Sequence, residues 1–414
     1  QAAPERDRDR QNSAPQGTPG AAQEKGLIHL DTYFAVSAPG LEPFTAQELA
    51  SLAFQPAGPG FQPSEGGILF KGELKDLYRA NLQLRTTSRI LARLGSFFRA
   101  TTFPELQKRA AHLPWERCLR PAQPVALHVT CRHSKLYHSD AVARSVLAGL
   151  EERLGKASPL VRSDEEADGH PPQLIVVRLA DDRCTVSVDS SGELLHKRGY
   201  RQAVAKAPVR ETLAAALILA SGWDSSAVLL DPFCGSGTIP IEAALIKFGI
   251  PPGISRRFAF MDWPGYDEAA FAAQRLALSS QAADLAARPP TPMILASDRD
   301  AGAIEMARAN AERAGVAEHI EFKCQAVSAI APPAGPGWLV TNPPYGVRVS
   351  EGHDLRNLYA QLGNVLRRKC PGWSVTVLCN DPSLLGQMQM ELDSSLGFVN
   401  GGIGVRVGRG KVIA

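Results

Sequence analysis

The stretch AVLLDPFCGSGTIPIEAAL, residues 227–245, decides the fold class. An apolar run leads to Asp231, a turn with Gly235 and Gly237 follows, and an apolar helical pattern begins near Thr238. A short buried strand that turns through glycines into a helix is typical of the first unit of a parallel α/β sheet. Such a turn is where a nucleotide-like ligand sits, because glycines allow close approach and the helix start offers free N–H groups.

Three more apolar runs extend this pattern, and helical sequence alternates with them: MILASD at 293–298, GWLVTN at 337–342 and SVTVLCND at 374–381. Short buried strands that alternate with helices predict a doubly wound α/β, Rossmann-like domain, which we place at residues 196–414. The segment at about 249–290 is long for one connection. We therefore expect an insertion there, with a helix or two of its own.

The first half of the chain has a different pattern. Residues 27–195 contain short strand-like runs bounded by Gly, Pro and Asp, such as TYFAVSAPG at 32–40 and LIVVRLA at 174–180. They predict an α+β module rather than a parallel sheet. Residues 1–26 contain no Leu, Ile, Val, Met or aromatic residue, so they cannot bury enough apolar surface to fold, and we expect a disordered tail.

Composition excludes several classes of protein. The hydrophobic content of 44% is ordinary for a globular chain, and the longest apolar run is too short to span a bilayer. The first residues, QAAPERDRDRQ, are charged where a secretory signal would be apolar. The seven Cys form no Cys-x-x-Cys pair, which argues against a disulfide framework and a zinc knuckle. We expect a cytoplasmic protein with no metal and no membrane partner.

The net charge of +3 is a sum that hides a strong segregation along the chain. Between Arg79 and Arg144 there are 12 Lys and Arg against three acidic residues, an excess of +9. Within that stretch, Arg85, Arg89 and Arg93 recur every four residues in LRTTSRILARL. This spacing predicts an amphipathic helix with three guanidinium groups on one side. That side is either a solvated face or a surface that contacts phosphates.

Two further motifs follow predicted strands. Asp298 ends MILASD, where a carboxylate can accept hydrogen bonds from both hydroxyls of a ribose. TNPPYG at 341–346 follows GWLV, and its two prolines fix an extended backbone without donors. Asn342 adds a side-chain oxygen and Tyr345 a flat face for a base. An exocyclic amine held by Asn342 and a backbone carbonyl would direct its nitrogen lone pair at an electrophile.

DPFCGSGT at 231–238 followed by NPPY at 342–345 resembles the S-adenosylmethionine-dependent amino-methyltransferases. The string LHKRGYRQAVAKAPVRETLAAALILASGW at 195–223 is similar to the THUMP-domain-containing RNA guanine-N2 methyltransferases. In that family a ferredoxin-like and THUMP region binds RNA and a Rossmann-like domain transfers the methyl group. The resemblance implies S-adenosylmethionine as cofactor and a guanine N2 amine as acceptor. The RNA it favours is large-subunit (23S) rRNA.

The resemblance also implies a role for individual residues. The cofactor would contact Asp231, Phe233, Gly235, Gly237, Thr238, Asp298, Gln325 and Ala326, and the target guanine would contact the catalytic residues Asn342, Pro343 and Tyr345. RNA would contact Arg85, Arg89, Arg93, Lys197, Arg198 and Arg201. The chain departs from the family at Val327, where an acid usually contacts the adenine of the cofactor. That hydrogen bond is either missing or supplied by another residue such as Ser328.

Three alternatives remain open. The tRNA guanine-N2 methyltransferases share the same architecture. A DNA adenine-N6 methyltransferase also uses NPPY, but the THUMP-like half disfavours it. In a different class, a THUMP protein that binds RNA without catalysis would tolerate the loss of the acid at Val327. Because the sequence ends at Ala414, we expect no second methyltransferase domain of the kind fused to some large-subunit rRNA enzymes.

Overall fold

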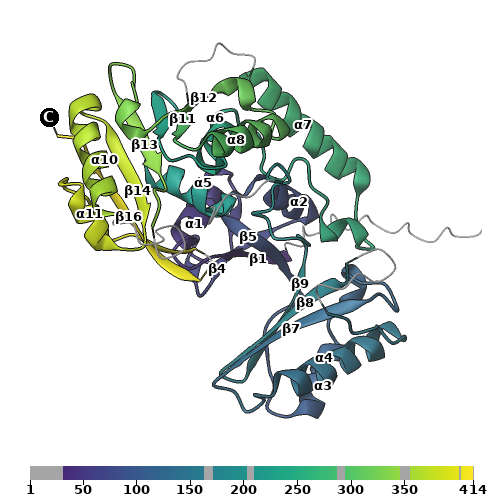
Figure 1. Ribbon diagram of the computed structural model, residues 1–414. Helices are drawn as coiled ribbons and strands as arrows, with labels where there is room; N and C mark the ends of the chain where they lie inside the picture. Colours follow the sequence, from purple (N-terminus) through teal and green to yellow (C-terminus); the bar gives the residue numbers. More distant parts are fainter. Residues whose placement is uncertain are drawn as a thin grey trace, which may run out of the picture.

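The computed structural model describes residues 31–162, 171–202, 209–286, 294–345, 355–400 and 402–413. The expected disordered tail, residues 1–26, lies outside these ranges. The described residues fold around two sheets, with the N-terminal module on one side and the C-terminal module on the other (Figure 1).

A continuous sheet builds the N-terminal module. Its main strands follow the order β2-β4-β1-β5-β9-β8-β7, and short strands β3 (Pro63–Ser64) and β6 (Phe98–Arg99) pair at its sides. The strands are β1 (Asp31–Ser37), β2 (Gln55–Pro56), β4 (Gly67–Gly72), β5 (Thr87–Arg93), β7 (Val125–Arg132), β8 (Gln173–Ala180) and β9 (Arg183–Asp189). The helices are α1 (Glu42–Ser51), α2 (Leu74–Gln83), α3 (Phe103–Ala111) and α4 (Ser139–Leu154), with a 3₁₀ turn η1 (Trp115–Arg117). The predicted α+β module is confirmed.

The C-terminal module has the predicted doubly wound sheet. Its strand order is β12-β11-β10-β13-β14-β16-β15, parallel from β12 to β14 and antiparallel at β16 and β15. The strands are β10 (Val228–Asp231), β11 (Ile294–Asp298), β12 (Ile320–Cys324), β13 (Gly337–Thr341), β14 (Ser374–Cys379), β15 (Gly397–Asn400) and β16 (Ile403–Lys411). The order reverses between β10 and β13, so their carboxyl ends form the crevice where ligands bind in open α/β sheets.

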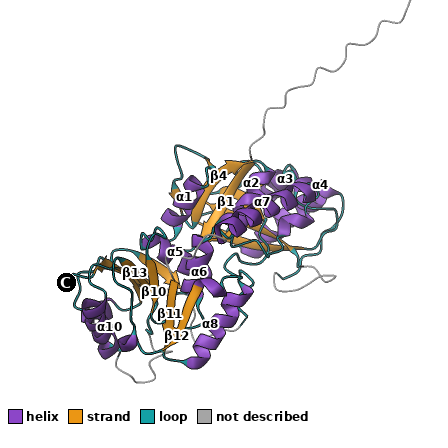
Figure 2. Ribbon diagram, turned by 90° about the horizontal axis from the view of Figure 1, so that it is seen from above, coloured by secondary structure: helices purple, strands orange, loops and turns teal. Residues whose placement is uncertain are grey.

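Helices cover both faces of this second sheet. Figure 2 shows α10 (Arg356–Lys369) on one face and α5 (Glu211–Ala220), α6 (Thr238–Lys247) and α8 (Ala301–Arg313) on the other. A short helix, α11 (Pro382–Gln387), follows β14. The 3₁₀ turns η3 (Ala317–His319) and η4 (Val327–Ala329) flank β12. One apolar cluster lies under α6 and α8 and another under α10, so the sheet is buried on both sides.

The predicted insertion joins the two modules. It contains η2 (Ala259–Asp262) and the helix α7 (Glu268–Ala286), and its aromatic side chains enter the core of the N-terminal module. The rings of Phe260 and Tyr78 stack with centroids 4.7 Å apart, and the Trp263 indole donates to the Gln173 side chain at 2.8 Å. The insertion, which we call the strap, therefore extends from the C-terminal module and packs on the N-terminal module.

The prediction of a helix that carries Arg85, Arg89 and Arg93 is wrong. α2 ends at Gln83, and after a turn the chain forms β5, a central strand between β1 and β9. A spacing of four is close to one helical turn, but it is also even, so it places Arg89 and Arg93 on one face of β5, while Arg85 precedes the strand. Thr86, Thr87 and Ser88 favour the strand over the helix.

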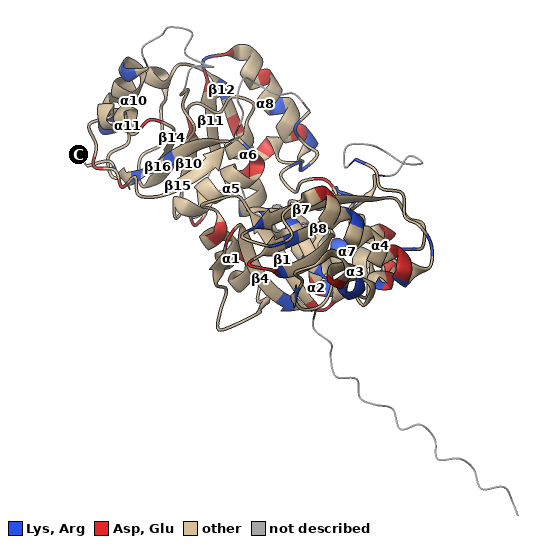
Figure 3. Ribbon diagram, turned by 90° about the horizontal axis from the view of Figure 1, so that it is seen from below, with Lys and Arg blue, Asp and Glu red and all other residues tan. Residues whose placement is uncertain are grey.

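The charge segregation along the sequence is largely cancelled in space. Arg89 pairs with Asp189, Arg99 with Asp182 at 3.7 Å, and Arg117 with Asp31. Basic and acidic residues are interspersed over the N-terminal module in Figure 3. The excess of +9 between Arg79 and Arg144 is therefore not a single basic face.

Candidate functional site

The carboxyl end of β10 carries a buried carboxylate. Asp231 is 1% exposed, and its Oδ1 accepts hydrogen bonds from the Thr341 hydroxyl at 2.6 Å and the Phe233 backbone N–H at 3.1 Å. Burial raises the pKa of Asp231 to about 7, and the nearby charge of Asp298 acts in the same direction. Thr341 is the last residue of β13, so this hydrogen bond joins the turn after β10 to the start of the NPPY segment.

The two glycines of the turn have different roles. Both have a positive φ, +50° at Gly235 and +87° at Gly237, which L side chains rarely adopt. A Cβ at Gly235 would have no atom within 4 Å, whereas one at Gly237 would lie 2.9 Å from the Cβ of Ala307 in α8. Gly235 therefore faces open space that a ligand can fill, while Gly237 allows α6, which begins at Thr238, to pack against α8.

Asp298 lies beside this turn at the end of β11. Its Oδ2 accepts from the Gly235 N–H and its Oδ1 from the Asp300 N–H, both at 3.0 Å. These bonds fix the carboxylate and leave each oxygen a further lone pair for a ligand hydroxyl. Asp300 is the N-cap of α8 and accepts from the Gly302 N–H at 2.9 Å.

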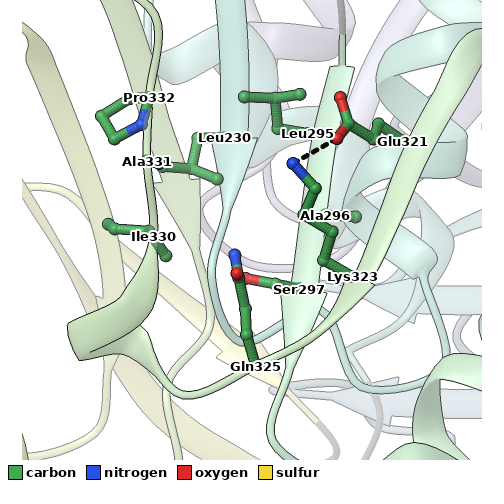
Figure 4. Close-up of a pocket in the computed structure, with 10 residues that line it drawn as sticks. All are labelled: Leu230, Leu295, Ala296, Ser297, Glu321, Lys323, Gln325, Ile330, Ala331 and Pro332. Carbon is green, nitrogen blue, oxygen red and sulfur yellow. Dashed lines mark ion pairs between the residues drawn. The ribbon is translucent and has the colours of Figure 1, made fainter.

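A pocket opens on the sheet next to the turn that follows β12. Its lining comprises Leu230, Leu295, Ala296, Ser297, Glu321, Lys323, Gln325, Ile330, Ala331 and Pro332. In Figure 4 the Gln325 side chain extends toward Ser297, and an ion pair joins Lys323 to Glu321. Ala326 is exposed after Gln325, while Val327 is 5% exposed in the apolar cluster under α10. Val327 therefore packs in the core, and the neighbouring Ser328 is exposed.

The NPPY segment contains an unpartnered acceptor. Asn342 follows β13 directly, and its buried Oδ1 has no hydrogen-bond partner in the part of the chain that the structure describes. Pro343 is buried, and Tyr345 packs against the clusters on both faces of the sheet. The Tyr345 hydroxyl accepts a hydrogen bond from Asn400 at 3.3 Å, which fixes the ring. A buried acceptor without a donor costs free energy, so Asn342 is suited to a ligand N–H.

Residues of the N-terminal module and the junction hold α6, the helix after the turn. Arg85 donates to the carbonyls of Leu245 at 3.1 Å and Ile250 at 2.8 Å, at the C-terminal end of α6. Inside the helix, Glu242 is fully buried, and its Oε1 lies 3.5 Å from Arg198 Nε and accepts from the Tyr200 hydroxyl at 3.1 Å. We name this set, Arg85, Arg198, Tyr200 and Glu242, the α6 anchor.

The α6 anchor changes the interpretation of the six basic residues expected to contact RNA. Arg198 is 5% exposed and also donates to the carbonyls of Leu195 and Arg85. The remaining four contact protein groups as follows: Arg89 with Asp189, Arg93 over the ring of Phe34 at 5.4 Å, Lys197 with Glu193 at 2.8 Å, and Arg201 with Glu211 at 3.0 Å. Among the six, Lys197 alone is exposed. RNA contact by these residues stays a prediction.

Sequence reasoning missed Glu242 and Thr341. Glu242 is the single charged residue in the apolar stretch TIPIEAALI, which was the available signal: a buried charge requires a partner. Thr341 carried no such signal, because its partner Asp231 is 110 residues away.

Two kinds of feature are absent from the described ranges. No set of three or more His, Cys, Asp or Glu there is arranged to hold a metal ion. No helix in those ranges combines the length and apolar character needed to cross a membrane.

Three family models match the chain. The model described as RMKL-like, methyltransferase domain covers residues 198–407, which is half of the chain. The RlmL ferredoxin-like domain matches residues 32–91, and the THUMP domain matches residues 100–189.

Curated relatives match over nearly the whole chain. A Synechocystis sp. protein, provisionally named RNA methyltransferase slr0064, is 31% identical over 90% of this chain and 94% of its own. Two proteins named ribosomal RNA large subunit methyltransferase K/L are 34% identical (Syntrophotalea carbinolica) and 33% identical (Shewanella baltica), over 91% and 90% of this chain. This chain spans about half the length of those two, 53% and 52%.

Solved structures share the complete two-module architecture. SMU.472, provisionally named a methyltransferase and solved with SAH, has a TM-score of 0.78 at 29% identity and covers 92% of this chain and 98% of its own. A Listeria monocytogenes protein, described as a predicted N6-adenine-specific DNA methylase, has a TM-score of 0.77 at 32% identity, with coverage of 92% and 96%. The chain therefore belongs to the family that combines an RlmL-type ferredoxin-like domain, a THUMP domain and an RMKL-like methyltransferase domain.

Proposed function

We propose that this protein transfers a methyl group from S-adenosylmethionine to the exocyclic N2 amine of a guanine in RNA, most directly in large-subunit rRNA. The observation that carries the proposal is the unpartnered Oδ1 of Asn342 at the topological switch point of the sheet. An amine that donates one hydrogen to Asn342 and the other to a nearby backbone carbonyl is held with its lone pair free to attack.

The turn after β10 fits the cofactor. S-adenosylmethionine, when bound, supplies an electrophilic methyl group on a sulfonium. The open space at Gly235 admits it, and Asp298 keeps lone pairs for its ribose hydroxyls. Gln325 and Ala326 follow β12 and would contact its adenine. Val327 is packed in the core, so an adenine contact from this turn falls to exposed Ser328 or to the backbone.

The role of the protein is to position the two reactants. The Asp231–Thr341 hydrogen bond ties the glycine turn to the NPPY segment, so a shift of one displaces the other. Tyr345, with its hydroxyl fixed by Asn400, offers a ring against which the base can pack. A guanine inside a helical stack cannot reach this site at the required angle, so the nucleotide must be extruded.

The relatives and the N-terminal domains support RNA as the substrate. Two curated relatives carry large-subunit rRNA names, and the chain has a THUMP domain. A tRNA guanine is the second candidate, because such enzymes share this architecture. The Listeria monocytogenes protein carries the name of a DNA adenine-N6 enzyme, and the THUMP domain favours RNA over that alternative. Family membership and the intact site favour catalysis over RNA binding alone.

Mass-spectrometric mapping of methylated guanines tests the proposal. Large-subunit rRNA and tRNA are purified from cells with and without the gene, and N2-methylguanosine is separated from other methylated nucleosides. We expect one N2-methylguanosine in rRNA to disappear with the gene and to return with the wild-type protein but not with Asn342→Ala. Loss of an N2-methylguanosine from tRNA instead of rRNA would show that tRNA is the substrate. Loss of N6-methyladenine from DNA purified from the same cells would overturn the RNA assignment.

A further inference from the structure

A hollow lies on the N-terminal module at the turn between β8 and β9, beside β6. Four residues line it: Phe97, Arg99, Asp181 and Arg183. Phe97 and Arg99 come from β6 and the residue before it, and the other two come from the turn and the start of β9. The hollow belongs to the THUMP-matched region and its immediate N-terminal edge.

Hydrogen bonds fix the backbone around this hollow. Asp182 is 9% exposed; its Oδ1 accepts from the Lys135 N–H at 2.8 Å and its carbonyl accepts from the Ala100 N–H at 3.0 Å. Its own N–H donates to the Ser134 hydroxyl at 3.1 Å. Arg99 Nη2 lies 3.7 Å from its second carboxylate oxygen. β6, the β8–β9 turn and the loop after β7 therefore meet at one buried side chain and form a preorganised surface.

The surface exposes a large aromatic ring that the fold does not require there. The Phe97 side chain is 60% exposed, while the adjoining Ala100 is fully buried. Arg183 lies over the Phe97 ring at 5.2 Å from its centroid. This arrangement occupies one side of the ring and leaves much of the side chain open to solvent. Tyr137, in the loop held by Asp182, is 68% exposed.

The side chains of the hollow indicate the chemistry of its ligand. Arg99 and Arg183 are paired across β6 and β9 and supply two guanidinium groups, while Asp181 lines the hollow and the Asp182 carboxylate lies 3.7 Å from Arg99. A guanidinium group binds phosphate through paired N–H groups, and an exposed ring beside arginines can stack a base while the flanking phosphates are bound. Asp181 can accept from the N–H groups on the edge of that base. A duplex keeps its bases stacked on each other and offers only its outer surface.

We propose that this hollow binds a nucleotide of a single-stranded RNA segment, with the base stacked on Phe97 and the flanking phosphates on Arg99 and Arg183. The proposal rests on RNA being the substrate, as argued above. It assigns the hollow a positioning role: it holds an unpaired part of the RNA away from the methyl acceptor. It does not depend on which guanine is methylated.

The test measures binding of the full chain to a short fluorescein-labelled single-stranded RNA of mixed sequence, by anisotropy and without S-adenosylmethionine. We expect Phe97→Leu to weaken binding at least about fivefold, which corresponds to roughly 1 kcal/mol, the lower end for one base on an aromatic ring. Phe97→Trp should retain the affinity, and its fluorescence should be quenched by the RNA. Leu276→Ala is the matched control, because Leu276 is 69% exposed on α7.

The two arginines are tested by salt dependence. Arg99→Ala with Arg183→Ala should reduce the slope of log K against log salt by about 1.4, because each phosphate contact on a single strand contributes about 0.7. Arg275→Ala, which removes an exposed cation next to Leu276, should leave the slope unchanged.

Two results would overturn the inference. The first is equal affinity of Phe97→Leu and wild type for the single strand, with the fluorescence of Phe97→Trp unaffected by RNA. The second is an equal loss for a duplex of the same sequence, which would exclude stacking of an unpaired base. Because no methyl transfer is measured, a wrong assignment of the methylated base leaves these outcomes intact. Failure of wild type to bind any RNA would instead refute the proposed function.

Discussion

The two glycines of the turn after β10 provide a matched pair of substitutions that separates ligand binding from packing. Alanine at a positive φ costs about 1–2 kcal/mol at either position. At Gly235 the added Cβ meets no atom within 4 Å, so that cost stands alone. At Gly237 the Cβ would lie 2.9 Å from Ala307 Cβ and 3.2 Å from its Cα, which adds about 1–3 kcal/mol of overpacking. We expect destabilisation of about 1–2 kcal/mol for Gly235→Ala and about 2–5 kcal/mol for Gly237→Ala.

Gly235→Ala, the less destabilised of the two variants, should lose more affinity for the cofactor than its small loss of stability would suggest. The Gly235→Ala methyl group occupies space that the cofactor is expected to fill, so its affinity should fall at least about tenfold while the fold survives. Thermal unfolding of the full chain gives the stability, and calorimetric titration with S-adenosylmethionine gives the affinity. Gly222→Ala, at φ +70° with no atom near its Cβ, is the control for backbone strain away from the turn. Wild-type affinity in Gly235→Ala would refute the placement of the cofactor.

Two further predictions concern buried charges. The pKa of Asp231 in the folded protein, about 7, lies above the usual carboxyl value, so its contribution to stability is complete below pH of about 4 and is lost as pH rises toward 7. Asp231→Asn should therefore gain stability relative to wild type between these pH values. Parallel pH profiles of the unfolding free energy of the two proteins would contradict this. In the α6 anchor, Arg198→Met or Glu242→Gln alone should lower the unfolding free energy by about 3–5 kcal/mol, because either leaves a buried charge without its partner. A double-mutant cycle of thermal unfolding should show that the double variant loses less than the sum of the two single losses. Strict additivity would show that Arg198 and Glu242 do not interact.

Sequence patterns predicted the second module well because its strands are short apolar runs that end at candidate site residues. All four runs became parallel strands, and Asp231, Asp298 and Asn342 lie at or just beyond the carboxyl ends of three of them. Parallel strands align these ends at one edge of the sheet, so their meeting follows from the pattern alone. The NPPY segment was informative because prolines dictate backbone geometry locally.

The predicted helix was wrong where the local structure depends on contacts between distant segments. The spacing of Arg85, Arg89 and Arg93 fits a helix and a strand equally, and only the pairing with β1 and β9 decides between them. Likewise, a basic sequence does not reveal whether its charges meet acids or solvent. Arg85 and Arg198 proved to hold α6, which begins at the glycine turn, so substitution of either would disturb the fold as well as any RNA contact.

The α6 anchor suggests how the two modules act together. Arg85 belongs to the segment before β5 of the N-terminal module, and α6 begins at the glycine turn. Under the proposed function, an RNA bound to the N-terminal module would be presented to a turn whose helix is fixed by that same module. The strap that carries Phe260 and Trp263 adds a second attachment.

The most direct test of the central claim is single-turnover methyl transfer by Asn342→Ala on the RNA identified by mapping. S-adenosylmethionine and RNA affinities are measured on the same preparations. Asn364→Ala, which removes an exposed amide on α10, serves as the control. We predict a rate at least about 100-fold lower for Asn342→Ala, because the amine loses its alignment, with both affinities close to wild type. A wild-type rate for Asn342→Ala would contradict the account.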